Sequence, residues 1–226
     1  MAISRFSLDE SLREDLRSGM TLLTPSYRLA ASVLEAYGSG TGKQSWIEPR
    51  IVAVDVWLIE LWETLASRGM QPFVELEILD SQLEKDLWLE AIESTRDAHP
   101  LIDASAMAQI AARAFQDLRR WSTDPLVHAM TPYLELEDVR IFSEWQARFE
   151  RRCEELRRIT LVQAVALLTQ CVAQEIASLA GPLALLNFYS PPPNYRALFD
   201  ALGQYGDIYR HYTLRRETLE LDLSQL

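Results

Sequence analysis

The residues of this chain that first suggest chemistry are the glycines and the lysine of segment 38–43, Gly-Ser-Gly-Thr-Gly-Lys. A phosphate-binding loop of the G-x-x-x-x-G-K-[ST] type surrounds phosphates with backbone N–H groups and binds magnesium through a hydroxyl. Counting back from Gly42 and Lys43, the first glycine position holds Tyr37, and Gln44 stands where serine or threonine is required. The segment also follows a predicted helix rather than a strand. We therefore interpret it as a flexible linker and not as a nucleotide site.

The histidine, cysteine and carboxylate residues form no recognisable catalytic or metal-binding motif. His99, His128 and His211 lack the spacing of zinc ligands, and the sequence holds no Cys-x-x-Cys. Its two cysteines lie in helical patterns and cannot form a disulfide framework. Acidic groups such as Glu75 and Glu77 fall in predicted turns or helix starts, where carboxylates commonly stabilise the helix dipole. We predict no catalytic residue, no cofactor and no bound metal.

The charge of the chain limits what it binds. With 33 acidic and 22 basic residues, the formal net charge is −11 at pH 7. Strong nucleic-acid binding by this chain alone is not expected, because such affinity rests on cations that neutralise phosphates. Arginines do cluster among glutamates, at Arg148, Arg151, Arg152, Arg157 and Arg158. The favoured interpretation is a solvated, ion-paired helix face, and a phosphate-binding stripe is the alternative.

Length and composition indicate a globular protein. A chain of 226 residues with 48% hydrophobic and 24% charged residues can bury a large core. No apolar run approaches the length that crosses a bilayer, and the N-terminal residues lack the basic-then-apolar plan of a signal peptide. We expect a cytoplasmic protein with no membrane partner.

Two strand-to-helix junctions, one near each end, dominate the pattern. The strand Met20–Leu23 meets a helix that Thr24 caps with Pro25 at its first position, and the strand Leu183–Asn187 precedes a helix over Asn194–Leu202. Short apolar runs that pass into helical spacing are βα units of a parallel sheet. Two more strands are predicted, at Arg50–Val54 and Asp207–Thr213. The four strands are expected to share one largely parallel sheet.

The rest of the chain reads as helix. Capping boxes predict starts at Ser7 with Glu10, Ser81 with Glu84, and Thr160 with Gln163. Further helices are predicted over Asp103–Trp121 and Glu137–Arg157, the former buried through Met107, Ala111, Ala114, Leu118 and Trp121. The tryptophans are predicted to be core anchors, with Trp46 as a possible exposed contact. The expected domains are an α/β core over 1–79 and 181–226 and a helical insertion over 80–180.

Several segments resemble one bacterial family in the same order along the chain. The segment 22–30, LLTPSYRLA, is similar to the "TPNRRLA" start of probable DNA repair proteins related to AddB-type helicase–exonuclease subunits. The likeness continues in short stretches of the remaining sequence: 46–51 (WIEPRI), 57–62 (WLIELW), 81–88 (SQLEKDLW), 142–149 (FSEWQARF) and 185–192 (LLNFYSPP).

The resemblance implies a fold and a function. Family members carry an N-terminal helicase-like region and then a PD-(D/E)XK nuclease domain. This chain corresponds to the N-terminal region alone, as a piece of a longer protein or a solitary remnant. It implies a RecA-like, degenerate P-loop-type parallel sheet interrupted by a helical insertion.

No functional residue of active helicases carries over. The first loop reads Thr24-Pro25-Ser26-Tyr27, and Leu186 and Asn187 stand where an Asp-Glu pair binds magnesium and water. The implied function is a non-catalytic segment of a DNA repair or recombination protein, acting as scaffold or DNA-positioning module without ATPase activity. Its implied partners are single-stranded or duplex DNA and other helicase–nuclease subunits.

Possible DNA contacts are two residues outside the arginine cluster, Arg28 and Trp46, and the five cluster arginines named above. Two other functions stay open. One is an enzyme that binds a small ligand at the carboxyl ends of the strands, near Ser26, Tyr27, Arg28 and Tyr189. The other is a protein-interaction module that acts through the helical insertion.

Overall fold

A computed structural model describes residues 8–39, 47–95, 103–121, 136–171, 181–204 and 209–213. Contacts divide the chain into two compact units. The first unit comprises Met1–Trp57, Ala173–Ser190 and Leu202–Leu226. The second unit comprises Leu58–Val172 and Pro191–Ala201. Each unit is described separately.

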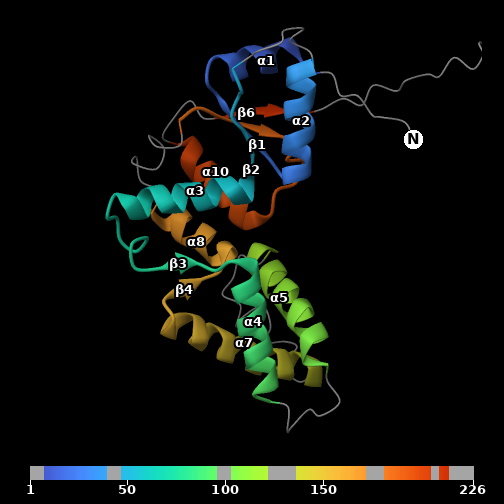
Figure 1. Cartoon of the computed structure of the whole chain (residues 1–226), viewed down its shortest axis with the longest axis vertical. Helices are drawn as coiled ribbons and strands as arrows, with labels where there is room; N and C mark the ends of the chain where they lie inside the picture. The colour runs from blue at the N-terminus through green and yellow to red at the C-terminus, as the bar shows by residue number, and fades with distance from the viewer. Residues whose placement is uncertain are drawn as a thin grey trace, which may run out of the picture. The chain divides into compact units, whose positions relative to one another are not determined.

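The described residues are mostly helical. Their helices are α1 (Glu10–Arg17), α2 (Tyr27–Ser39), α3 (Val54–Ser67), α4 (Ser81–Glu93), α5 (Ala104–Trp121), α7 (Glu137–Glu155), α8 (Leu161–Cys171) and α10 (Pro193–Gly203) (Figure 1). Their strands are β1 (Thr21–Thr24), β2 (Ile51–Ala53), β3 (Glu77–Ile78), β4 (Arg158–Ile159), β5 (Leu183–Leu186) and β6 (Tyr209–Tyr212). No helix within the described ranges combines the length and hydrophobicity that a membrane span requires.

The first unit contains a parallel sheet with the strand order β2-β1-β5-β6. Leu22 lies opposite Ile51 of β2 on one side and Ala184 of β5 on the other, and Leu183 of β5 lies opposite Tyr209 of β6. The prediction of one parallel sheet from these four segments is confirmed. Every residue of β1 and β5 is buried, as expected for central strands with both faces covered.

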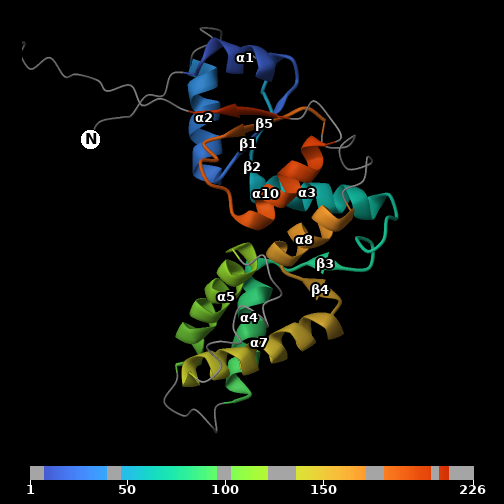
Figure 2. The same cartoon turned by 180° about the vertical axis from the view of Figure 1, so that it is seen from behind.

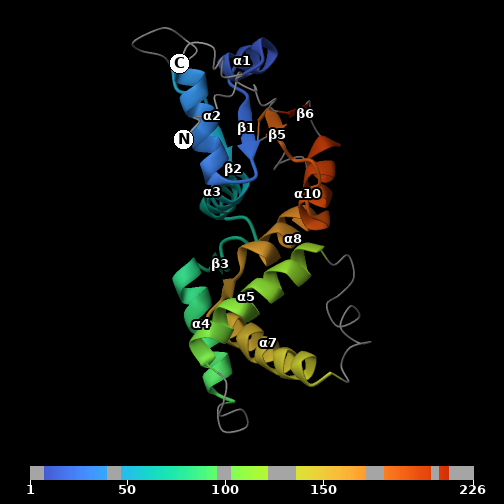
Figure 3. The same cartoon turned by 90° about the vertical axis from the view of Figure 1, so that its right-hand side faces the viewer.

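Two helices cover one face of this sheet. Leucines of α1 and Val33 and Tyr37 of α2 form a buried cluster with Leu22, Ala184 and Leu186. Figure 3 shows α2 running alongside β1 and β2. The guanidinium of Arg13 on α1 donates to the carbonyl oxygens of Ala36 and Tyr37, at 3.3 Å each, and so satisfies the last turn of α2.

Three of the four predicted helix starts are wrong by one or two residues. Asp9 and Asp80 are the N-caps of α1 and α4, because each carboxylate accepts backbone N–H groups of the first turn. Ser26, not Thr24, caps α2, since its hydroxyl accepts from the N–H of Leu29. The proposed partner Ser7 lies outside the described residues. The capping box of Thr160 and Gln163 is confirmed by reciprocal hydrogen bonds of 3.1 and 3.4 Å.

The second unit is built around one buried tryptophan. Figures 1 and 2 both show α4, α5 and α7 packed together. Trp88 of α4 is fully buried and stacks on Phe149 of α7, with ring centroids 4.2 Å apart and an interplanar angle of 10°. Phe115 of α5 meets the Trp88 ring edge-on at 5.7 Å. This stack fixes the three helices against one another.

The burial of α5 and the end of α7 correct two predictions. The buried positions of α5 are Ala104, Ala108, Ala111 and Phe115, whereas Trp121 is 56% exposed and does not anchor the core. The small alanines let α4 approach closely, so the contact stripe is rotated away from the larger apolar side chains. The helix α7 ends at Glu155 instead of Arg157, because Arg157 adopts a left-handed conformation and the next residue enters β4.

We expect Trp88→Ala to lower the free energy of unfolding by about 3–5 kcal/mol, because it removes a fully buried ring from the three-helix stack. The matched control is Trp121→Ala, which removes a mostly exposed ring and should change that free energy by less than about 0.5 kcal/mol. Urea denaturation of both variants measures the difference. Equal losses would contradict the placement of the two tryptophans.

Candidate functional site

The first candidate region is the junction between β1 and α2. Only Pro25 and Ser26 separate the last residue of β1 from the first residue of α2. The buried hydroxyl of Thr24 donates to the carbonyl oxygen of Ser26 at 3.0 Å and holds this turn closed. A phosphate-binding loop needs a longer glycine-containing segment with consecutive backbone donors, and proline has no N–H. The junction therefore has neither the length nor the donors to surround a triphosphate.

The second junction follows β5, the neighbour of β1. Leu186 is fully buried as the last strand residue. Asn187 has a φ of 59°, and its N–H donates to the carbonyl oxygen of Tyr212 at 2.9 Å. Its side-chain oxygen accepts from the Tyr189 hydroxyl at 3.3 Å. At the positions where helicases place an Asp-Glu pair, this junction thus carries an apolar side chain and an amide that fixes backbone geometry.

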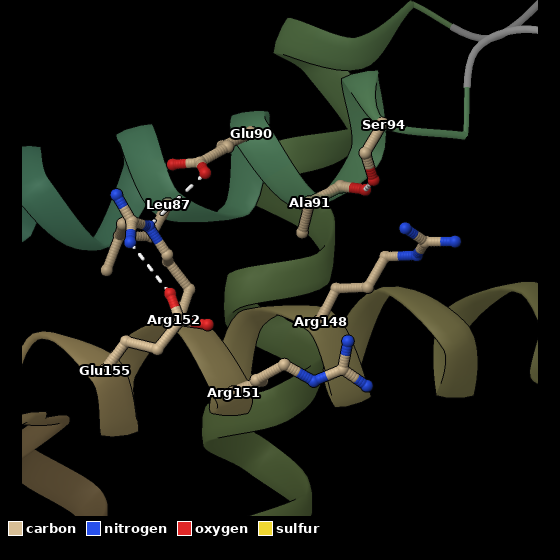
Figure 4. A pocket seen from close by; sticks show the side chains of 8 residues that line it. All are labelled: Leu87, Glu90, Ala91, Ser94, Arg148, Arg151, Arg152 and Glu155. Atoms are coloured by element: carbon tan, nitrogen blue, oxygen red, sulfur yellow. Dashed lines mark hydrogen bonds and ion pairs between the residues drawn. The ribbon is translucent and has the colours of Figure 1, made fainter.

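An arginine-lined groove lies between α4 and α7 within the second unit. Its volume is about 220 Å³. Figure 4 shows the side chains that line it: Leu87, Glu90, Ala91, Ser94, Arg148, Arg151, Arg152 and Glu155. The stack of Trp88 on Phe149 sets the separation of the two helices, and i, i+3 and i, i+4 spacing places the three arginines on neighbouring turns of α7.

The two ends of this groove differ in charge. At one end, the Arg152 guanidinium lies 3.3 Å from a Glu90 carboxylate oxygen and 2.8 Å from one of Glu155, so its charge is compensated twice. At the other end, Arg148 and Arg151 extend beside Ser94 (Figure 4). Arg148 pairs with Glu144 at 2.8 Å, an exposed i, i+4 pair that is weak in water.

Arg151 is the cation that the groove leaves uncompensated. It is exposed and forms no ion pair with any residue that the structure describes. Its guanidinium has planar, paired N–H donors that match phosphate and carboxylate oxygens. The groove therefore offers an anion one free guanidinium, with a second one in a weak pair beside it.

The other predicted DNA contacts do not join this groove. Arg158 pairs with Glu77 across β3 and β4, and Arg157 lies exposed in the turn before β4. Arg28 is exposed on the first turn of α2, in the first unit. Trp46 falls outside the described residues. The ion-paired interpretation holds for Arg148, Arg152 and Arg158, whereas Arg151 stands apart from it.

Sequence reasoning did not single out a polar cluster between α4, α5 and α7. The side chain of Gln116 donates to both Glu84 oxygens, at 3.1 and 3.3 Å. Burial raises the pKa of Glu84, against the opposing effects of this hydrogen bond and of Arg120. Burial and the nearby charge of Glu84 raise the pKa of the Cys153 thiol to about 12, which keeps it protonated and unreactive. The cluster therefore serves packing, and only its spatial arrangement reveals it.

Metal ligands and relatives add no further site. Within the described ranges, no group of three or more His, Cys, Asp or Glu side chains is placed to hold a metal ion. No family model matches the chain, and no curated protein matches it either. Function is therefore inferred from the two strand junctions, the groove and the sequence resemblance.

We expect Glu84→Gln to gain stability relative to the parent chain as the pH rises from 4 to 8. The raised pKa means that the folded chain binds the Glu84 proton more tightly than the unfolded chain does. Stability linked to this proton is complete at low pH and is lost as the pH rises through the raised pKa. The glutamine variant has no such proton to lose and keeps an oxygen for Gln116.

Urea denaturation at both pH values measures this difference. Glu63→Gln, on the exposed side of α3, is the control and should stay within about 0.5 kcal/mol of the parent at each pH. A stability difference between Glu84→Gln and the parent that does not change with pH would show that burial of the carboxyl is not what the structure indicates.

Proposed function

We propose that this chain is a non-catalytic, helicase-like segment of a bacterial DNA repair or recombination protein of the helicase–nuclease type. In this proposal it is a cytoplasmic scaffold with a degenerate RecA-like sheet that positions DNA without hydrolysing ATP. Its partners are DNA and the remaining parts of a helicase–nuclease assembly.

The sheet supports the helicase-like part of the proposal. The resembling segment 22–30 covers β1, its two-residue connection and the start of α2, and segment 185–192 covers the end of β5 and the loop after it. These two strands pair directly in parallel. The resemblance is thus concentrated where strand carboxyl ends meet, which is where parallel α/β proteins usually bind ligands.

The closed turn after β1 carries the non-catalytic part of the proposal. Thr24 and Ser26 are bonded to each other and to α2, so their polar groups are already used. A triphosphate requires several donors and a cation to offset its charge. With Leu186 and Asn187 at the second junction, magnesium has no carboxylate partner at the corresponding strand end.

The groove between α4 and α7 supports the DNA-positioning part. Arg151 presents an uncompensated guanidinium there, and Arg148 is only weakly paired. One or two phosphate contacts on a chain with a net charge of −11 give weak, salt-sensitive binding. Such affinity suits a segment that guides a strand already held elsewhere in a larger protein.

We expect single-stranded oligonucleotide to bind weakly at low salt, and Arg151→Ala to lower that affinity and reduce the salt slope by about one. Fluorescence anisotropy across a salt series measures both quantities. The matched control is Arg140→Ala, which removes an arginine of the same helix that pairs with Glu137 and lies outside the groove. Equal effects of the two substitutions would mean that the groove is not the contact.

A further inference from the structure

Two exposed tyrosines follow the two central strands of the sheet. The Tyr27 side chain is 77% exposed and that of Tyr189 is 74% exposed, far more than a tyrosine that serves packing. Each stands three residues beyond the last residue of its strand, Thr24 of β1 and Leu186 of β5. Tyrosines so exposed, at matching positions, have no role in the core of the unit.

The sheet register brings these two positions to the same edge. The strands β1 and β5 pair in parallel with Leu23 opposite Leu185, so both chains leave the sheet at the same level. Neighbouring strands lie about 4.8 Å apart. The Tyr189 hydroxyl donates to the Asn187 side-chain oxygen, and Tyr27 is the first residue of α2. Both rings therefore project from backbone that the sheet and a helix hold in place.

A cation lies beside the tyrosines. Arg28 is exposed next to Tyr27, and its guanidinium forms no ion pair within the part of the chain that the structure describes. The first turn of α2 contains no acidic residue. We call Tyr27, Arg28 and Tyr189 the tyrosine edge. It combines two aromatic faces with one positive charge.

We propose that the tyrosine edge binds single-stranded nucleic acid, with bases stacked on Tyr27 and Tyr189 and a backbone phosphate on Arg28. Stacking on aromatic side chains tolerates any base and does not depend on net charge, so it suits an acidic chain. A small ligand is the less suitable occupant, because small-molecule sites bury 70–90% of their ligand, whereas these rings are open to solvent. The inference rests on the proposed function, whose DNA contact so far is an arginine.

The experiment measures binding of a fluorescent oligothymidylate at low salt. We expect the double variant Tyr27→Ala, Tyr189→Ala to lose at least about fivefold in affinity for each ring, with an unchanged salt slope. The matched control, Tyr27→Phe with Tyr189→Phe, keeps both rings and should bind within about twofold of the parent. An oligonucleotide with abasic positions should bind the parent more weakly and should not distinguish the parent from the alanine variant.

The outcomes separate this inference from the groove contact. Binding that depends on Arg151 but not on the tyrosines overturns the tyrosine edge and leaves the proposed function standing. Tyrosine-dependent binding that survives Arg151→Ala supports the tyrosine edge and removes the groove contact. Equal losses in the phenylalanine and alanine variants overturn the stacking, and so does binding of a protein but of no oligonucleotide. Absence of oligonucleotide binding at high micromolar protein overturns both.

Discussion

The parallel pairing of β1 with β5 is the constraint on which the first unit depends. Thr21 and Leu183 are partners in this pairing although almost the whole second unit lies between them in the sequence. Because β1 pairs with β2 on its other side, it is central, and its four residues are buried. The same register brings two strand ends to one edge, where a turn closed by Thr24 and an amide at Asn187 replace the groups that hold a nucleotide.

The second unit shows the same link between packing and surface chemistry. The stack of Trp88 on Phe149 fixes the separation of α4 and α7, and the arginines of α7 then face α4 across a groove. Glu90 neutralises Arg152 from the opposite helix, while Arg151 meets the uncharged Ser94 end. A uniform run of arginines in the sequence therefore becomes a surface with one compensated end and one available cation.

Local signals predicted what local interactions determine. The four strands and the Thr160 cap follow from short segments, and the structure confirms them. The pairing of β3 with β4 joins segments far apart in sequence, so no local pattern revealed it. The exposure of Trp121 depends on how closely alanines let two helices approach, and the distinct state of Arg151 depends on which α4 residue lies opposite. Neither follows from hydrophobic spacing or from a count of charges.

The central claim is a helicase-like sheet that does not use ATP. Isothermal titration of the chain with magnesium-ATP, in the presence of single-stranded oligonucleotide, tests it most directly. The closed turn after β1 predicts no heat beyond dilution, because no set of donors surrounds the triphosphate. Saturable micromolar binding that Lys43→Ala abolishes would contradict the account and would make segment 38–43 a nucleotide site.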